Sequence, residues 1–156
     1  MDKLIIQAQK NEITEHKIYS SLSKRIKDDN KKILEKISKD ELEHYNFWKK
    51  ISKKDVKENY LRIYFYILLA KILGLSFALK LMENGEKTAS NAYDKLKNKY
   101  KINPIIKDEQ RHEKDLLNVI KEERIEYASS IVLGLNDALV ELTGALAGLT
   151  FSLQKG

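Results

Sequence analysis

The sequence has no cysteine, a single proline and only three histidines in 156 residues. The absence of cysteine excludes a disulfide framework, a thiolate zinc site and an iron–sulfur cluster within this chain. Apolar residues make up 42% and charged residues 33% of the sequence, which is typical of a folded helical domain with a hydrophobic core. A chain without cysteine suits a reducing compartment, and the N-terminus shows no signal peptide, so we expect a cytoplasmic protein.

The net charge of +6 comes mostly from lysines interleaved with acidic residues, as in NKKILEKISKDELEH at residues 30–44. This pattern is typical of solvated helix faces. A basic chain can bind nucleic acid, but the sequence contains no recognisable nucleic-acid-binding module. We therefore expect no nucleic-acid partner.

Four long stretches place apolar residues at helical spacing, over about residues 2–27, 30–52, 75–100 and from 103 onward. Asn30 and Asn103 are expected to cap the second and fourth stretches, and Pro104 follows as the first helical residue. Residues 53–73 supply the length of about 20 helical residues that one connection across a bundle needs. The pattern predicts an all-α four-helix bundle with a long crossover.

Each of the four apolar stripes includes a glutamate, and two of them include a histidine three residues later. These residues are Glu12, Glu41, Glu86 and Glu109, with His44 and His112. An unpaired buried carboxylate costs several kcal/mol, so four of them on apolar stripes indicate a shared partner. Glu12 and Glu86 are each followed seven residues later by a tyrosine, Tyr19 and Tyr93. The chain therefore reads as two copies of one helical hairpin with a site between them.

Glutamate and histidine three residues apart lie on one helix face and can offer an oxygen and a nitrogen to the same metal pair. Two such turns and one glutamate from each remaining helix form the di-metal carboxylate pattern of ferritin-like bundles, and iron or manganese suits these ligands. Two alternatives stay open: zinc as the metal, or a metal-free core in which acids and histidines bond to one another. The third histidine, His16, has polar neighbours and is expected to be exposed.

Four segments resemble the rubrerythrin and bacterioferritin branch of the ferritin-like superfamily: NEITEHKIY, DELEHYNFW, ENGEKTASNAY and DEQRHEKDLL. The resemblance is nearest to the rubrerythrin-like domain of membrane-bound ferritins, which precedes a membrane domain of the vacuolar iron transporter type. It implies a ferritin-like domain over residues 1–125 with two iron ions. It also implies that Glu41 and Glu109 bridge the ions, that Glu12 and Glu86 are terminal ligands, and that His44 and His112 bind one ion each.

The sequence departs from rubrerythrins at Ala89, where they have a further glutamate, and it lacks their cysteine-ligated electron-transfer domain. We therefore expect no shift of iron between ligands unless Glu15 or Glu83 substitutes. Tyr19 and Tyr93 are interpreted as hydrogen-bond partners of the ligands or as oxidisable residues, with core tyrosines as the alternative.

Residues 128–154 form a nearly continuous apolar segment, long enough to span a bilayer, within an apolar C-terminal helix at residues 126–156. Asn136, Asp137 and Glu141 interrupt it, and acids at such a depth usually mark an ion path. The segment resembles the first membrane helix of vacuolar iron transporters. We expect a truncated or degenerate membrane protein at the cytoplasmic face of a membrane, or a soluble relative; a buried helix in a dimer is an equal alternative.

We expect a protein that oxidises ferrous iron with oxygen or peroxide, in iron homeostasis or oxidative-stress defence. Glu41, Glu109, Tyr19 and Tyr93 are the candidate catalytic residues. The first alternative is a non-catalytic domain that senses or delivers metal for an iron or manganese transporter, and the second is a metal-free dimerisation module. The apolar crossover and tail also predict a homodimer in which each tail packs on the other chain's crossover.

Overall fold

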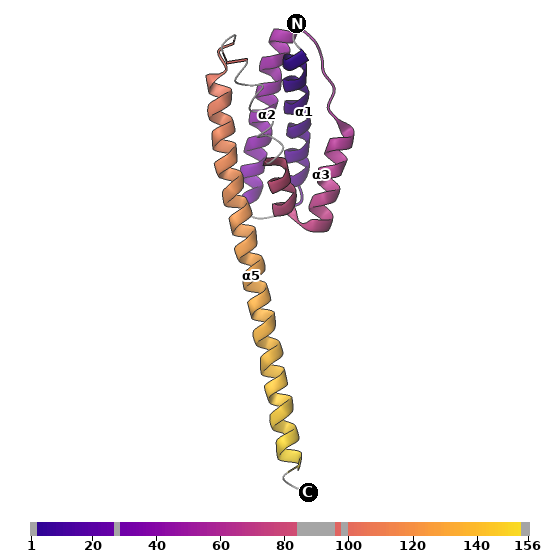
Figure 1. The fold of residues 1–156 in the computed structure, drawn as a ribbon, viewed down its shortest axis with the longest axis vertical. Coiled ribbons are helices and arrows are strands. Elements are labelled where there is room, and N and C mark those ends of the chain that lie inside the picture. The colour runs from indigo at the N-terminus through magenta and orange to yellow at the C-terminus, as the bar shows by residue number, and fades with distance from the viewer. Residues whose placement is uncertain (1–2, 27–28, 84–95, 98–99, 154–156) are drawn as a thin grey trace. The chain divides into compact units, whose positions relative to one another are not determined.

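The computed structural model describes residues 3–26, 29–83, 96–97 and 100–153, and the regular structure among them is helical (Figure 1). The elements are α1 (Lys3–Ser23), α2 (Asn30–Ser52), α3 (Tyr60–Leu73) and α5 (Asn103–Leu153), and residues 75–83 and 96–97 are helical as well. The chain divides into two compact units, Met1–Ile120 and Lys121–Gly156. The predicted all-α fold with a long apolar C-terminal helix is confirmed.

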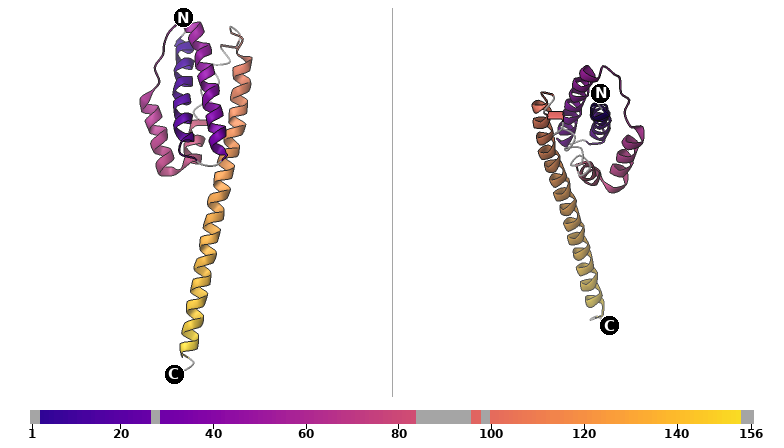
Figure 2. Two further views of the ribbon diagram at one scale, coloured as in Figure 1. Left: turned by 180° about the vertical axis from the view of Figure 1, so that it is seen from behind. Right: turned by 45° about the horizontal axis from the view of Figure 1, so that its top comes forward.

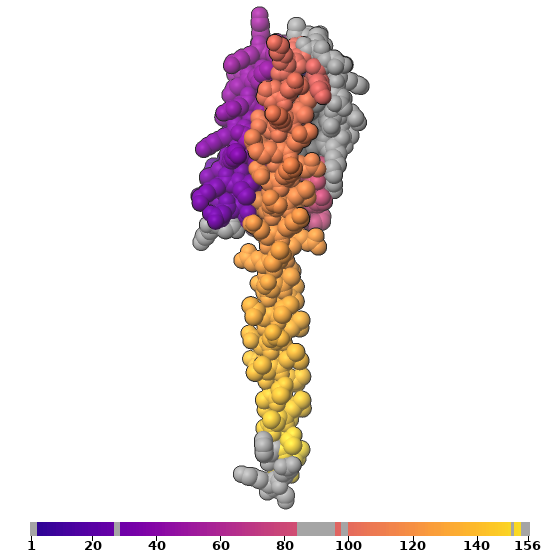
Figure 3. Space-filling view, turned by 90° about the vertical axis from the view of Figure 1, so that its left-hand side faces the viewer, coloured from indigo at the N-terminus to yellow at the C-terminus, as the bar shows by residue number. Residues whose placement is uncertain are grey.

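Within the first unit, α1 packs along α2 and also against α3, so that α1 lies between these two helices (Figures 1 and 2). The part of α5 that belongs to this unit lies beside α2, as the space-filling view of that face shows (Figure 3). Ion pairs between α2 and α5 join the two helices there. The three helices α1, α2 and α5 therefore enclose the interior in which the predicted ligands that the structure describes lie.

A polar layer separates two apolar clusters in this unit. One cluster includes Ile5 of α1, Trp48 of α2 and Ile105 of α5. The other includes Leu22 of α1, Ile37 of α2 and Leu116 of α5. On each helix, the predicted glutamates and histidines lie in sequence between its members of the two clusters. The two apolar clusters provide the hydrophobic stabilisation of the bundle, whereas the polar layer between them does not, so its residues need another explanation.

The helix ends differ in detail from the sequence prediction. The helix α1 ends at Ser23 instead of continuing to about residue 27. Asp29 is the N-cap of α2, and Asn30, predicted as the cap, is its first helical residue. The helix α3 has a side-chain cap, because Asn59 Oδ1 accepts a hydrogen bond from the backbone N–H of Arg62 at 3.2 Å. These differences are confined to the helix ends and do not move the ligands.

The crossover consists of a non-helical segment, residues 53–59, followed by α3. Two side chains of α1 hold the non-helical segment: Gln9 Nε2 donates to the Lys54 carbonyl at 2.9 Å, and Thr14 Oγ1 accepts from the Asn59 N–H at 2.9 Å. One face of α3 joins the core. The opposite face exposes the apolar side chains Leu61, Tyr64, Leu68 and Ile72.

The second unit, taken by itself, is the C-terminal part of α5. Its side chains are exposed from Arg124 to Thr150. Its exposed large apolar side chains include three consecutive residues, Ile131, Val132 and Leu133, so they cover more than half of the helix circumference. The helix is long and apolar enough, by length and composition, to cross a membrane. An apolar surface of this width is typical of a helix that is buried in protein or lipid.

Candidate metal centre

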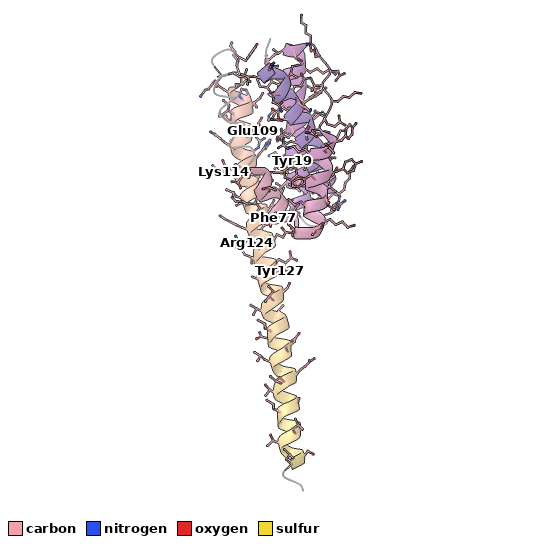
Figure 4. The ribbon with its side chains drawn as sticks, turned by 45° about the vertical axis from the view of Figure 1, so that its right-hand side comes forward. Tyr19, Phe77, Glu109, Lys114, Arg124 and Tyr127 are labelled. Carbon is pink, nitrogen blue, oxygen red and sulfur yellow. The ribbon has the colours of Figure 1, made fainter. Side chains whose placement is uncertain are left out.

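Four side chains from three helices converge in the polar layer. Glu12 of α1, Glu41 and His44 of α2 and Glu109 of α5 each offer one ligand atom, and these atoms lie within 4.8 Å of one another. Glu12, Glu41 and His44 are buried, whereas the side chain of Glu109 is 28% exposed. Figure 4 labels Glu109 on the part of α5 that faces the other helices. The group could hold a metal ion.

The distances around His44 suit a shared ion better than direct hydrogen bonds. His44 Nδ1 lies 3.5 Å from Glu41 Oε2, 3.5 Å from Glu109 Oε1 and 3.6 Å from Glu12 Oε2. Ligand atoms bound to one ion at about 2.1 Å stand roughly 3 to 3.5 Å apart. The observed separations are therefore close to those of atoms that surround one ion.

His112 of α5 lies on the other side of Glu41. Its Nδ1 is 3.1 Å from Glu41 Oε1, and its ring centroid is 6.0 Å from that of His44. Each oxygen of Glu41 thus faces a different histidine. The carboxylate of Glu41 therefore lies between two imidazoles from different helices.

Several buried polar atoms at this site make no hydrogen bond within the part of the chain that the structure describes. They are Glu41 Oε2, His44 Nδ1 and His112 Nδ1. A buried polar atom without a partner costs about 1–3 kcal/mol, so three of them in one small volume call for a common partner. Oxygen and imidazole nitrogen are suitable donors for iron or manganese. The residues therefore fit a bound metal.

Burial and neighbouring charges shift the pKa values at the site. Burial, followed by the charge of Glu41, raises the pKa of Glu12 to about 8. Burial and the charge of Glu109 would raise the pKa of Glu41, but contacts with His112 and His44 outweigh both and lower it. Burial would lower the pKa of each histidine, but contacts with the glutamates raise both. In the metal-free protein the site holds protons, which a metal ion must displace.

Two aspartates and a tryptophan that sequence reasoning did not select also contact the site. Asp40 Oδ2 lies 3.1 Å from His112 Nε2, and Asp108 Oδ2 lies 3.4 Å from His44 Nε2. Trp48 Nε1 donates a hydrogen bond to Glu12 Oε1 at 3.2 Å. The repeat in the sequence could have indicated the two aspartates, because an aspartate directly precedes the glutamate in both Glu-x-x-His turns.

The other predicted site residues have different outcomes. Tyr19 is buried in the apolar cluster that contains Leu22, and its predicted redox or hydrogen-bonding role stays a prediction. Figure 4 labels it on α1. Glu86 and Tyr93 fall outside the described residues, as does Ala89, so their assignments stay predictions.

The prediction that His16 is exposed is wrong. This side chain is half-buried, and its Nδ1 lies 2.7 Å from the Ser38 carbonyl oxygen and 3.0 Å from Ser38 Oγ. Its sequence neighbours are polar, but α2 covers it in the folded bundle. His16 therefore links α1 to α2.

The two glutamates considered as substitute ligands are buried and paired with basic side chains. Glu15 Oε1 lies 3.0 Å from Arg62 Nη2, and Glu83 Oε2 lies 2.7 Å from Lys80 Nζ. Neither belongs to the four-residue group described above. An ion pair gives each carboxylate a structural explanation that needs no metal.

These features define a class of protein: a helical bundle with a buried carboxylate and histidine site that could hold metal. The sequence profile of the rubrerythrin family matches residues 3–120, about three quarters of the chain, and the chain belongs to this family, which has the ferritin-like fold. No protein with a curated description matches it, and no solved structure does.

Proposed function

We propose that this chain is a di-iron carboxylate protein that oxidises ferrous iron with oxygen or hydrogen peroxide. The observation that carries the proposal is the position of Glu41, with Oε1 at 3.1 Å from His112 Nδ1 and Oε2 at 3.5 Å from His44 Nδ1. One carboxylate between two imidazoles from different helices suits two neighbouring ions, each with its own histidine. Membership of the rubrerythrin family supports the same proposal.

In this proposal the residues have distinct roles. Glu41 and Glu109 would be shared by both ions, and Glu12 would bind one of them. Glu86 takes the corresponding place at the other ion. Four carboxylates and two neutral imidazoles then balance the charge of two divalent ions, which removes the cost of burying the acids unpaired.

Two bound ferrous ions would supply two electrons, which with two protons convert one hydrogen peroxide into two waters. The chain contributes position and electrostatics. The near-complete burial of Glu12 and Glu41 limits access of bulk water to the site. The carboxylates also stabilise the additional positive charge that develops on oxidation.

The test is a stoichiometric oxidation assay on the full chain. Ferrous iron is added anaerobically, and hydrogen peroxide or oxygen is then supplied while its consumption and the ferric absorption are recorded. The proposal expects about two ferrous ions oxidised per peroxide at a rate well above that of free iron. Binding of two metals without faster oxidation would instead support the alternative, a domain that senses or delivers metal.

We also propose that residues 128–154 attach the protein to the cytoplasmic face of a membrane, as in the membrane-bound ferritins. The support is the length and composition of α5 and the broad exposed apolar surface of its C-terminal part. Flotation with phospholipid vesicles tests this. Recovery of the detergent-free protein in the vesicle fraction is expected; an oligomer that stays with the soluble fraction would favour the alternative, in which the tail is buried between subunits.

A further inference from the structure

A single arginine side chain joins the two aspartates beside the candidate metal centre. Arg111 Nη2 lies 2.8 Å from Asp40 Oδ2 and 2.8 Å from Asp108 Oδ1. Asp40 is on α2, whereas Asp108 and Arg111 are on α5. The Arg111 side chain is 39% exposed, so it lies at the edge of the site and not within the group of ligands.

Each aspartate contacts the histidine of the other helix. Asp40 of α2 faces His112 of α5 at 3.1 Å, and Asp108 of α5 faces His44 of α2 at 3.4 Å. In both histidines the contacting atom is Nε2, and Nδ1 faces the glutamates. An unbroken series of polar contacts therefore runs from His44 through Asp108, Arg111 and Asp40 to His112.

A carboxylate that accepts the Nε2–H of a histidine fixes the ring orientation and the tautomer with a free Nδ1. Here two such carboxylates share one nitrogen of one guanidinium. A displacement of either aspartate changes the position of the arginine, and with it the support of the other histidine. Two histidines that would serve different metal ions are thus held by one common residue.

We propose that Arg111 is a positioning residue that couples the two metal positions, so that binding of the first ion orders the histidine for the second. The inference rests on the proposed two-metal site. The first ion bears the entropy cost of ordering the network of Asp40, Arg111 and Asp108. The second ion then binds to a site that is already ordered. Arginine suits this role because the two N–H groups of this one nitrogen lie in the fixed guanidinium plane and can donate to two carboxylates, whereas lysine is a flexible point charge.

Stepwise cobalt(II) binding to the full chain tests the coupling. Cobalt(II) is stable in air and its visible absorption reports the coordination of each ion, so the readout does not depend on oxidation activity. Titrations by calorimetry and absorption give the two stepwise dissociation constants. In Arg111→Gln we expect the second step to weaken relative to the first by roughly fivefold or more.

A double-mutant cycle on the aspartates gives an independent measurement. Asp40→Asn is expected to weaken both binding steps, not only the step at His112. Asp108→Asn is likewise expected to weaken both steps, not only the step at His44. Loss of such supporting contacts typically costs about 10–100-fold in metal affinity. In the double variant the combined loss should differ from the product of the single losses by more than about twofold, the limit expected of independent sites.

Two further variants separate coupling from general stability. Arg62→Gln removes another arginine that holds a buried acid, Glu15, and should leave the ratio of the two steps unchanged. Arg111→Lys keeps the charge and should restore only part of the coupling. Circular dichroism checks that each variant is folded, and the aspartate cycle needs no variant of Arg111.

The inference would be overturned if two cobalt ions still bind and each aspartate substitution weakens only one binding step, with additive losses in the double variant. An unchanged ratio of steps in Arg111→Gln would do so as well. Binding of a single ion, or of none, to the unmodified chain would instead refute the two-metal function itself. The two failures are therefore distinguishable.

Discussion

Trp48 donates its indole N–H to Glu12 Oε1 across 3.2 Å, so the single tryptophan of the chain contacts a predicted metal ligand directly. The indole is fully buried and also packs edge-on against Phe47, with ring centroids 5.1 Å apart. The tryptophan fluorescence of the chain therefore comes from one residue in contact with the site. The same contact fixes the orientation of a carboxylate that the proposed function assigns to a metal.

We predict that cobalt(II) or ferrous iron quenches the fluorescence of Trp48 strongly, because a paramagnetic ion bound to Glu12 would lie next to the indole. Titration of the anaerobic protein measures this. Zinc, which has a filled d shell, is the control and should change the intensity much less. Strong binding of cobalt(II) by calorimetry without quenching would place the metal away from Glu12.

Glu41→Ala should abolish oxidation activity more completely than Glu12→Ala. Glu41 faces both His44 and His112, whereas the contact of Glu12 is with His44. Loss of the first therefore affects both ions, and loss of the second affects one. Initial rates of iron oxidation with peroxide compare the variants, and equal residual rates would contradict the assigned roles.

The stability conferred by metal should increase with pH. Glu12, with its pKa raised from 4.5 to about 8, is protonated in the folded metal-free protein and ionised in the unfolded chain, so its contribution to stability falls as pH rises through this interval. The raised pKa values of His44 and His112 act in the same direction, because their stabilising charge is complete below 6.5 and is lost as pH rises through the folded values. Metal binds the deprotonated groups and reverses the loss.

Thermal unfolding with and without manganese(II), between about pH 6 and pH 8.5, checks this prediction. At a metal concentration of about 100 times the dissociation constant, binding adds roughly 2.7 kcal/mol to the free energy of unfolding. We expect the metal-induced rise in Tm to be larger at the higher pH. A rise that is independent of pH would mean that no proton is displaced.

The chain should not be a monomer in detergent-free solution. The exposed face of α3 includes Leu61, which is 84% exposed, and the tail adds further exposed apolar residues. Exposed apolar patches beyond a few hundred Å² are rare on soluble monomers. Light scattering measures the mass directly, and a monodisperse species of 18.1 kDa would contradict the prediction.

The positions of Glu12, Glu41, His44 and Glu109 illustrate how far spacing alone can lead. Each lies on an apolar stripe with helical period, so a bundle that buries the stripes must also bring these side chains inside. Spacing within one helix determines which side faces the core. It therefore predicted the group without any knowledge of which helices are neighbours.

The contacts of Asp40 and Asp108 could not be predicted in the same way. They depend on the register between α2 and α5, which a periodic pattern does not specify. The hydrogen bond of Trp48 could not be predicted either. An indole on an apolar stripe indicates core packing, and this hydrogen bond depends on the position of α1. His16 was misjudged for the same reason.

The crosswise pairing of Asp40 with His112 and of Asp108 with His44 means that neither Asp-Glu-x-x-His turn is complete by itself. The histidine of each turn is contacted by the aspartate of the other turn. If the repeat arose by duplication, the ancestral hairpin could have formed the same arrangement only with a second copy of itself. After fusion, substitutions in one turn are constrained by the other, so the two turns are expected to evolve as a pair.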